Sequence, residues 1–427
     1  MRDPAQQRFD ALFGPEFGHG KGFDLSRLHR TLRTLDAPHE KLAPVIHVAG
    51  TNGKGSAIAF MQAIAAAAGL RTHAFTKPHL FRFAERFSVA GAPAPDAKLA
   101  AAAEQIAAID PGLTQFDAQV AAAFLLFSAT PADLVLIETG MGGRTDSTNV
   151  LPAPAATIIT PIGLDHRDAL GETLAAIAAH KAGILKPGTP AILARQAEDA
   201  RAVLEAEAAR VGAPLYRQGF EWDAFASLGR LVVQTETRAL DLPLPALHGA
   251  HQLDNAGLAC VALMAAMPQI ADEALAEGVV RAAWPGRLQP LTRGPFSAIV
   301  RVQRGEVWVD GGHNEHAAAA LANALKEMKS RRGGANIAIV GQRLRKDAEA
   351  FLHQLCAGVD AVIATPMPEA HVEPERIAHL ARENGIEATT APTLLQAMKI
   401  AAQYPAPRVL ICGSFLMAAE ALAAESG

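Results

Sequence analysis

The 427-residue sequence predicts an α/β protein with two domains. The first is a P-loop-type parallel-sheet domain with a small antiparallel appendage, and the second is a smaller Rossmann-like α/β domain. Three observations predict this fold class. The chain is too long for one ordinary core. Short apolar runs alternate with helical stretches, which is typical of a parallel sheet covered by helices. A Gly-rich loop directly joins the first apolar run to a helix.

The N-terminal domain is expected to span residues 1–289. Its first elements are a buried strand over 44–49 and an Ala-rich helix over 56–68. Later strands are predicted at 134–137, 156–160 and 191–194, and helices near 117–128, 174–184, 251–266 and 272–283. Between about residues 214 and 247 the pattern changes to short β-like pieces, including 231–235, and predicts the antiparallel appendage.

The C-terminal domain is expected to span residues 290–427, after a connector with the sequence WPGRLQP. Strands are predicted at 307–309, 337–340, 361–364 and 409–411. Each of these strands precedes a helical stretch, which again indicates an α/β arrangement.

Charge, cysteines and the first residues exclude several classes of protein. A net charge of −4 is too small to gather the chain onto nucleic acid or an anionic membrane. Cys260, Cys356 and Cys412 are far apart, so neither a disulfide framework nor a thiolate metal site is expected. The opening MRDPAQQRFD has no apolar signal core, and no long apolar span follows. We therefore expect a cytoplasmic protein.

The loop after the first predicted strand has the composition of a phosphate-binding loop. Glycines let backbone N–H groups converge on phosphate oxygens, the following helix offers its positive end, and a lysine supplies charge. An ordinary Gly-rich turn is the alternative, but the position between a strand and a helix favours phosphate binding. The loop residues are Gly50, Thr51, Asn52, Gly53, Lys54, Gly55 and Ser56.

Seven further segments follow the GTNGKGS loop. They are HLFRFAERFSVAG (79–91), ETGMGGRTDSTNV (138–150), ITPIGLDHRDALGETLAAIAAHKAGILKPG (159–188), LHGAHQLDNA (247–256), WPGRLQ (284–289), DGGHNEHA (310–317) and GSFL (413–416). Together they resemble the folylpolyglutamate synthase and dihydrofolate synthase family of the Mur ligase superfamily, over essentially the whole chain. The resemblance implies an ATP-dependent ligase that joins L-glutamate to the carboxylate of dihydropteroate or a reduced folate through an acyl phosphate.

Such a ligase needs magnesium ions at the nucleotide phosphates, held by hard oxygen ligands. Glu138 and His166 each follow a predicted strand, at the edge of the sheet where ligands gather. The resemblance implies that they hold two magnesium ions with Ser56, and that a carbamylated Lys181 provides a further oxygen ligand. The alternatives are a helix-capping glutamate, a structural histidine and a solvated lysine.

The resemblance also implies roles for residues farther along the chain. Asp146 is similar to a pterin-binding aspartate, although a turn aspartate commonly bonds only to local backbone. Arg82 and Lys77 are further substrate candidates. Nucleotide contacts are implied for Asn255, Arg287, Asp310, His313 and Asn314, with His313 counted among the catalytic groups beside Lys54, His166 and Lys181. The domains would close over ATP by a hinge near 286–295. The chain is expected to be a monomer, and a potassium ion is a further candidate cofactor.

Lys77 departs from the family pattern, which has Ser-Pro-His where this chain has Lys77-Pro78-His79. A lysine cannot coordinate magnesium, and an ammonium near the ion is strongly repelled. Lys77 must turn away, replace part of the metal's charge at the phosphates, or signal reduced activity, and we favour a contact between ammonium and phosphate. Asp117 and Glu315 are smaller departures, expected to alter a substrate contact and to loosen a helix start.

Two other functions are alternatives. A cell-wall Mur-type amino-acid ligase shares the chemistry, but the GGRTDSTN and WPGR segments disfavour it, as does the lack of a separate domain for a uridine nucleotide. A nucleotide-binding relative with weakened catalysis would explain Lys77. The presence of Lys54, Glu138, His166, Lys181 and His313 disfavours that second reading.

Overall fold

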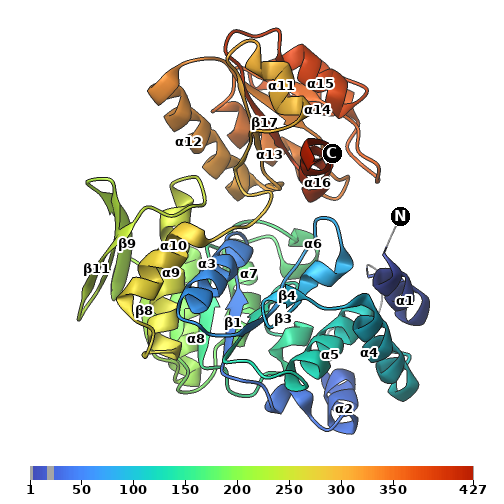
Figure 1. Cartoon of the computed structure of the whole chain (residues 1–427), viewed down its shortest axis with the longest axis vertical. Coiled ribbons are helices and arrows are strands. Elements are labelled where there is room, and N and C mark those ends of the chain that lie inside the picture. The colour runs from blue at the N-terminus through green and yellow to red at the C-terminus, as the bar shows by residue number, and fades with distance from the viewer. Residues whose placement is uncertain (1–2, 17–23, 427) are drawn as a thin grey trace. The chain divides into compact units, whose positions relative to one another are not determined.

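The computed structural model describes residues 3–16 and 24–426, and the chain divides into two compact units (Figure 1). The first unit contains Met1–Ala246 and Leu253–Ala283, and the second contains Leu247–Gln252 and Trp284–Gly427. Each unit has its own central sheet of mainly parallel strands. The predicted α/β fold class is therefore confirmed.

An eight-stranded sheet forms the centre of the first unit, in the order β4-β3-β2-β5-β1-β6-β7-β8. Its strands are β1 (Val45–Ala49), β2 (Thr72–Phe75), β3 (Phe87–Val89), β4 (Ala92–Pro93), β5 (Leu134–Glu138), β6 (Ala156–Ile159), β7 (Ala191–Leu193) and β8 (Leu215–Arg217). Neighbours from β2 to β8 pair in parallel, whereas β3 and β4 are antiparallel at one edge. β1 and β5 are buried along their whole length, as central parallel strands covered on both faces must be.

Helices cover this sheet and bury its apolar side chains. They are α1 (Pro4–Phe13), α2 (Ser26–Thr34), α3 (Lys54–Ala67), α4 (Asp96–Ile109), α5 (Gln115–Ser128), α6 (Arg167–Leu170), α7 (Leu174–Lys181), α8 (Glu198–Val211), α9 (His251–Ala266) and α10 (Asp272–Arg281), with short 3-10 turns η1 (Pro38–Glu40), η2 (Phe83–Arg86), η3 (Ser147–Val150) and η4 (Ala182–Ile184). α10 packs closely on α3, because a Cβ on Gly278 would lie 2.3 Å from Ile64 Cα. This contact helps to fix the helix that follows the Gly-rich loop.

The antiparallel appendage is a three-stranded sheet of β9 (Trp222–Ser227), β10 (Arg230–Thr235) and β11 (Ala239–Pro243). Leu231 and Val233 of β10 are buried and Arg230 is exposed, which is the alternation expected of a sheet with one covered face. The expected start near residue 214 was wrong. Residues 215–217 form β8, which pairs in parallel with β7 in the main sheet.

The second unit has a six-stranded sheet in the order β12-β13-β17-β14-β15-β16. Its elements are β12 (Gln289–Leu291), α11 (Pro295–Arg301), β13 (Glu306–Val309), α12 (Glu315–Arg332), β14 (Asn336–Val340), α13 (Ala348–Cys356), β15 (Ala361–Ala364), α14 (Pro374–Glu383), β16 (Glu387–Thr390), α15 (Leu394–Ala401), β17 (Arg408–Cys412) and α16 (Phe415–Ser426). The buried Arg408 ties three strands together at their amino ends, with bonds to Glu306 Oε1 (2.5 Å) and Asn336 Oδ1 (2.8 Å).

The three cysteines are buried free thiols. Burial raises the pKa of Cys260 to about 12 and that of Cys356 to about 11. None of the helices within residues 3–16 and 24–426 combines the length and apolarity needed to cross a membrane.

Candidate active site

The Gly-rich loop joins the end of β1 to the start of α3. Gly50 has a φ of +143°, and a Cβ there would lie 1.8 Å from Thr160 Oγ1. Gly53 is the N-cap of α3 with a φ of +92°. Glycine is needed at Gly50 for space and at Gly53 for its left-handed backbone. Lys54, Gly55 and Ser56 form the first turn of α3, where backbone N–H groups and the helix dipole favour an anion.

The first part of the loop is anchored to the segment after β6. Thr51 N–H donates to Pro161 O (3.0 Å), and Asn52 N–H points to the same oxygen (3.4 Å). The Thr51 hydroxyl bonds both the carbonyl and the N–H of Gly163, each at 3.1 Å. These two loop N–H groups therefore hold the loop in place, and the start of α3 is the part suited to bind phosphate.

Lys54 and Glu138 face each other at the carboxyl edge of the sheet. Glu138 is the last residue of β5, lies beside Val48 of β1, and is buried. Lys54 Nζ lies 3.8 Å from Glu138 Oε1 and donates to the carbonyls of Gly50 and Thr51, both at 3.1 Å. The structure thus brings an ammonium and a carboxylate together beside the loop.

Lys181 approaches the same loop from the end of α7. Its side chain is buried, and Nζ donates to Gly50 O at 2.7 Å. Burial and the positive charge of Lys54 lower the pKa of Lys181 to about 7, although Asp165 and Asp146 act in the opposite direction. An amine with this pKa is partly neutral near physiological pH, and a neutral amine is a nucleophile.

His166 lies just before α6 in a left-handed backbone conformation, with a φ of +53°. Its N–H bonds Asp165 Oδ1 at 2.9 Å. This conformation is uncommon for a residue other than glycine and often occurs at functional sites. A hollow beside the loop is lined by Gly50, Thr51, Lys54, Thr139, Gly140, Met141, Gly142, Asp165, His166, Leu170 and Lys181. His166 therefore shares one hollow with Lys54 and Lys181.

The donors beside the Gly-rich loop fit a magnesium ion that also binds nucleotide phosphates. Within residues 3–16 and 24–426, no three His, Cys, Asp or Glu side chains form a metal cage. The site offers instead the Glu138 carboxylate and the His166 imidazole, with the Ser56 hydroxyl in the first turn of α3. Mg²⁺ commonly uses one or two protein carboxylates together with nucleotide phosphates and water. Glu138 is the buried carboxylate nearest to the loop lysine.

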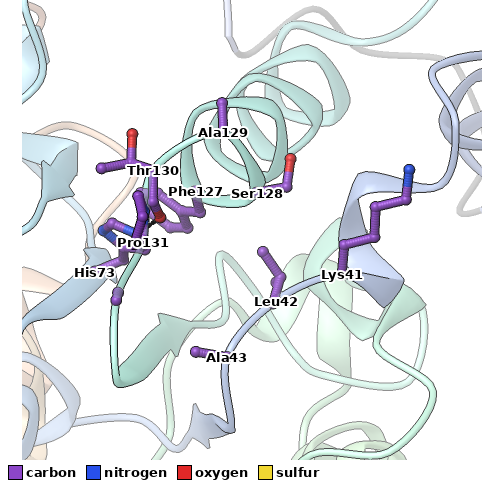
Figure 2. Close-up of a pocket in the computed structure, with 10 residues that line it drawn as sticks. Lys41, Leu42, Ala43, His73, Phe127, Ser128, Ala129, Thr130 and Pro131 are labelled. Carbon is purple, nitrogen blue, oxygen red and sulfur yellow. Dashed lines mark hydrogen bonds between the residues drawn. The ribbon is translucent and has the colours of Figure 1, made fainter.

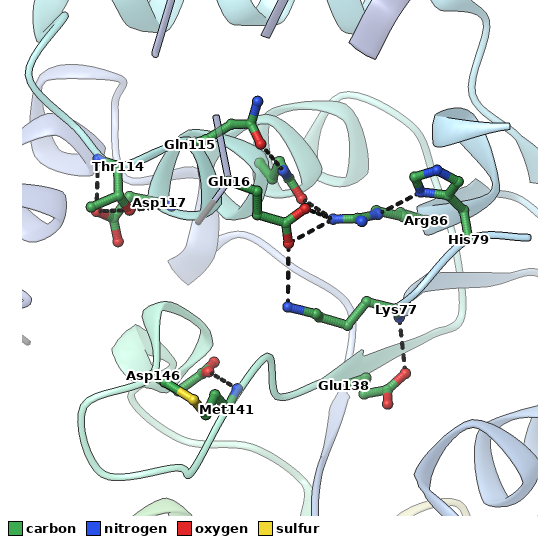
Figure 3. Close-up of polar contacts among 11 residues, drawn as sticks. Glu16, Lys77, His79, Arg86, Thr114, Gln115, Asp117, Glu138, Met141 and Asp146 are labelled. Carbon is green, nitrogen blue, oxygen red and sulfur yellow. Dashed lines mark hydrogen bonds and ion pairs between the residues drawn. The ribbon is translucent and has the colours of Figure 1, made fainter. Parts of the chain in front are cut away.

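Asp146 is buried and bonds local groups through both carboxylate oxygens, of which Figure 3 shows the contact with Met141. Oδ1 accepts hydrogen bonds from the Thr148 N–H (3.0 Å) and hydroxyl (2.5 Å), and Oδ2 accepts from Met141 N–H (2.7 Å). This is the local bonding that was the alternative to substrate binding. A carboxylate has about four acceptor positions, so the two roles are compatible.

Lys77 turns its ammonium toward Glu16, as Figure 3 shows. Nζ lies 3.3 Å from Glu16 Oε1 and 4.5 Å from the centre of the Phe116 ring. The Lys77 backbone N–H donates to Glu138 Oε2 at 3.0 Å. This arrangement differs from the ammonium-to-phosphate contact that we favoured, because a carboxylate distant in sequence, Glu16, pairs with the ammonium.

Arg82 and Asp117 have structural partners as well. Arg82 is exposed and pairs with Asp96 at the start of α4, with Nη2 and Oδ2 2.8 Å apart. Asp117 forms a capping box with Thr114 at the start of α5 and accepts a bond from the Ser147 hydroxyl at 2.6 Å. Neither contact involves the Gly-rich loop.

Asn255 lies on α9 against the loop. It is buried, and its Oδ1 would be 2.6 Å from a Cβ on Gly53. The family resemblance implies a nucleotide contact for this residue, and in the structure its amide meets the glycine before α3. Gly53 therefore needs to be glycine for the approach of Asn255 as well as for its backbone.

Four predicted residues gather at the carboxyl end of β13 in the second unit. Asp310 Oδ1 accepts from Gly312 N–H (2.6 Å), and its Oδ2 accepts from Leu288 N–H (2.7 Å). Asn314 caps α12 through Ala317 N–H (2.9 Å). The other two, Arg287 and His313, both pack on the ring of Phe415.

These contacts fix the two basic side chains of the second unit. The Arg287 guanidinium lies 4.5 Å from the centre of the Phe415 ring, and the His313 ring lies 5.7 Å from it. His313 Nδ1 donates to Gly311 O at 2.9 Å. Glu315, which follows the capping Asn314, accepts a bond from Gln354 Nε2 at 3.1 Å. The cap and this bond stabilise a helix start that lacks the family proline.

A second hollow, of about 370 Å³, lies at the opposite, amino edge of the first sheet (Figure 2). It is lined by Lys41, Leu42, Ala43, His73, Phe127, Ser128, Ala129, Thr130, Pro131 and Ala132. His73 Nε2 bonds Thr130 O (2.9 Å), and Nδ1 accepts from Ala90 N–H (2.9 Å). Both ring nitrogens are thus used within the fold, and this hollow has neither the glycines nor the carboxylate of the loop site.

Several residues at the site were not predicted from the sequence. Glu16 contacts Lys77, and Thr148 contacts Asp146. Arg86 contacts Glu16, and His47 contacts Thr148, so these two reach the predicted residues through another side chain. Phe415 lies within the GSFL segment, which by itself assigns no role to the ring. Only the fold shows that these side chains meet.

Comparisons with known proteins agree with this geometry. Residues 296–415 match the family model described as Mur ligase, glutamate ligase domain. The dihydrofolate synthase/folylpolyglutamate synthase of Bacillus subtilis is 37% identical over 321 residues, which cover 71% of this chain and 72% of that protein. The protein of the same name from Escherichia coli is 31% identical over 403 residues, which cover 93% of this chain and 90% of that protein.

Solved structures give the same result. Escherichia coli FolC in complex with DHPP and ADP superposes with a TM-score of 0.87 and 29% identity, over 99% of this chain and 97% of that chain. The bifunctional folylpolyglutamate synthase/dihydrofolate synthase with Mn, AMPPNP and L-glutamate bound superposes with a TM-score of 0.85 and is 30% identical in sequence, over 99% of this chain and 98% of that chain. The loop between β1 and α3 and the residues gathered beside it agree with these relatives. The relatives show that the chain belongs to the dihydrofolate synthase/folylpolyglutamate synthase family.

Proposed function

We infer that this chain is an ATP-dependent ligase that forms an amide between L-glutamate and the carboxylate of dihydropteroate or a folate. The phosphate loop on β1 and α3, with Lys54, Glu138 and Lys181 beside it, carries this inference. Relatives in the family are named for both dihydrofolate synthase and folylpolyglutamate synthase activity. We propose both activities for this chain.

The proposed reaction has two steps. The carboxylate of the pterin substrate takes the γ-phosphoryl group of ATP, which gives an acyl phosphate and ADP. The amine of glutamate then attacks the acyl carbon, phosphate leaves, and the amine loses a proton. The start of α3 and the Lys54 ammonium bind the phosphates and offset the charge that develops on them.

Magnesium, when bound, neutralises phosphate charge and orients the transferred group. We propose that Glu138, His166 and Ser56 hold it beside the loop. The relative from Yersinia pestis was solved with AMPPNP and a Mn ion, which supports the use of a nucleotide and a divalent metal.

Lys181 is proposed to carry a carbamate. Its neutral amine adds to carbon dioxide and loses one proton, which turns it into an anionic oxygen donor for a second ion. Its burial against Gly50 O supports this, because a buried amine is more readily neutral. Protein equilibrated with ¹³C-bicarbonate should show a carbamate ¹³C resonance, absent in Lys181→Met. Identical spectra from the two proteins would contradict the modification.

Other assignments stay predictions that substitution can test. Asn255, Arg287, Asp310, His313 and Asn314 are proposed as nucleotide ligands, and Asp146 and Arg82 as contacts of the pterin substrate. Potassium use, a cytoplasmic location and a monomeric state are also predictions.

Purified protein tests the function directly. It is given ATP, magnesium and labelled glutamate with dihydropteroate, tetrahydrofolate or a muropeptide in turn. We expect ADP release and label transfer with dihydropteroate and tetrahydrofolate. Transfer only to the muropeptide would favour a cell-wall ligase, and nucleotide binding without transfer to any acceptor would favour a nucleotide-binding relative.

A further inference from the structure

Glu16 is a partly buried carboxylate between two cations. Its Oε1 lies 3.3 Å from Lys77 Nζ, and both of its oxygens accept from Arg86 Nη1, at 3.0 and 2.9 Å (Figure 3). Burial alone would raise the pKa of Glu16, but the attraction of Lys77 and Arg86 outweighs it and lowers this pKa to about 2. Glu16 is therefore an anion at neutral pH.

Arg86 is held in place by further hydrogen bonds within the first unit. Its Nη1 also donates to Gln119 Oε1 (2.8 Å), and its Nε donates to His79 Nδ1 (3.0 Å). The guanidinium is almost fully buried. Glu16 is thus attached to a part of the first unit that has little freedom to move.

Lys77 is the more mobile partner, because its ammonium ends a flexible four-carbon stem. The ammonium pairs with Glu16 on one side. On another side it packs against the face of the Phe116 ring, whose centre is 4.5 Å from Nζ. The backbone of the same residue already contacts Glu138, through an N–H to Oε2 bond of 3.0 Å. Glu138 is therefore a carboxylate within reach of the Lys77 side chain.

An ammonium on Glu138 would compete with a divalent cation. It would add a second positive charge to that of Lys54, whose Nζ is 3.8 Å from Glu138 Oε1. Two positive charges beside one carboxylate strongly disfavour a further cation. The position of Lys77 thus bears on metal binding although it is no ligand.

We propose that Glu16 is a positioning residue that retains the Lys77 ammonium away from Glu138 and so keeps this carboxylate able to bind a divalent metal. The proposal rests on the proposed role of Glu138 as a metal ligand. Glu16 acts through Lys77 and does not touch the metal or the substrate. The pair of Glu16 and Lys77 therefore acts together: a lysine at this position requires a carboxylate that retains it.

The test is a titration of Mn²⁺ against the full-length protein with saturating ADP, followed by electron paramagnetic resonance. Glu16→Gln should weaken Mn²⁺ binding by roughly tenfold or more, as expected for a unit charge moved close to the ion. Adding Lys77→Met to Glu16→Gln should restore the wild-type affinity. Glu104→Gln is the matched control, because it removes the same charge from an exposed pair with Arg8.

Two results would overturn the proposal. One is wild-type Mn²⁺ affinity in folded Glu16→Gln, and the other is a double variant that binds as weakly as Glu16→Gln. Should Glu16→Gln fail to fold, Lys77→Met alone tests the idea from the other partner. Because the ammonium is then gone, this variant should bind Mn²⁺ at least as tightly as the wild type. Weaker Mn²⁺ binding in Lys77→Met would equally contradict the idea.

A separate variant distinguishes this proposal from the one on which it rests, that Glu138 binds the metal. Glu138→Gln should weaken Mn²⁺ binding whether or not Glu16 has a role. Unchanged affinity in Glu138→Gln would remove the metal role of Glu138. A loss in Glu138→Gln without a loss in Glu16→Gln would leave that role intact and reject only the role of Glu16.

Discussion

A chain of hydrogen bonds leads from the centre of the first sheet to Asp146. The Thr148 hydroxyl donates its only proton to Asp146 Oδ1 (2.5 Å), so His47 Nε2, 2.8 Å from the same hydroxyl, must be the donor to it. Burial lowers the pKa of His47 to about 3, which keeps the ring neutral. Its proton is then on Nε2, and the buried Nδ1 has no partner. His47 and Thr148 therefore orient the Asp146 carboxylate.

Thr148→Val should disturb substrate binding more than turnover. The valine keeps the shape but removes the hydroxyl bond to Asp146, and a bond to a charged group contributes roughly 1.5–3 kcal/mol. We expect KM for dihydropteroate to rise about tenfold with a smaller change in kcat, measured by steady-state kinetics. Thr148→Ser, which keeps the hydroxyl, should behave as wild type. Equal KM values in the valine and serine variants would reject the role of this hydroxyl.

The direction of Lys77 shows why some site geometry could not be predicted from the sequence. The sequence marks Lys77 only as a departure from the Ser-Pro-His pattern of the family. Its partner Glu16 lies 61 positions earlier in the chain, and no local pattern links the two. By contrast, Lys54 and Glu138 follow predicted strands of one parallel sheet, so their approach could be expected from topology alone.

At the scale of elements, the connection between β1 and α3 depends on the space left by Gly50. A Cβ there would lie 1.8 Å from Thr160 Oγ1 and 3.0 Å from its N. Gly69, which ends the same helix, also has a positive φ (+74°), but a Cβ there would meet nothing within 4 Å. Both glycines have a positive φ, but only at Gly50 would a Cβ clash with a neighbouring side chain.

Gly50→Ala and Gly69→Ala separate these effects. Gly69→Ala should cost about 1 kcal/mol of stability from backbone strain alone and leave nucleotide affinity unchanged. Gly50→Ala should destabilise more and lose ADP binding, because the loop must move away from Thr160. Thermal unfolding and calorimetric titration with ADP measure both quantities. Normal ADP affinity in Gly50→Ala would show that the loop tolerates this displacement.

Most of the strands that were predicted are buried along their whole length, although β2 is equally buried and was not predicted. β1, β5 and β14 consist mainly of apolar residues, and their predicted positions differ little from the observed ones. β16 has the sequence EATT and is half exposed, so no apolar signal marks it. β8 has only three residues, and its place in the main sheet depends on a parallel pairing with β7 that local sequence does not encode.

At the scale of the whole molecule, the two units have separate hydrophobic cores. One core of the first unit packs the aromatic rings of Phe9, Phe83 and Phe87, and another packs α7 and α8 on β6 and β7. The core of the second unit packs α12, α13 and α14 on its own sheet. Separate cores allow each unit to open with its own free energy.

The buried cysteines can report these openings separately. Cys260 lies on α9 in the first unit, and Cys356 and Cys412 lie in the second. Burial keeps all three thiols from a reagent and raises their pKa values, so each should react only when its unit opens. Thiol labelling followed by peptide mass spectrometry then gives one rate for each unit.

MgADP should slow the labelling of Cys260, because the phosphate loop belongs to the first unit. At a ligand concentration of about 100 Kd, binding adds roughly 2.7 kcal/mol to the opening energy, or about a hundredfold in rate. The proposed role of Arg287 as a nucleotide ligand predicts slower labelling of Cys356 and Cys412 as well. Arg287→Ala should lose only this second effect, whereas Lys54→Met should lose both. Full protection of Cys356 and Cys412 in Arg287→Ala would exclude Arg287 as the group that couples the second unit to the nucleotide.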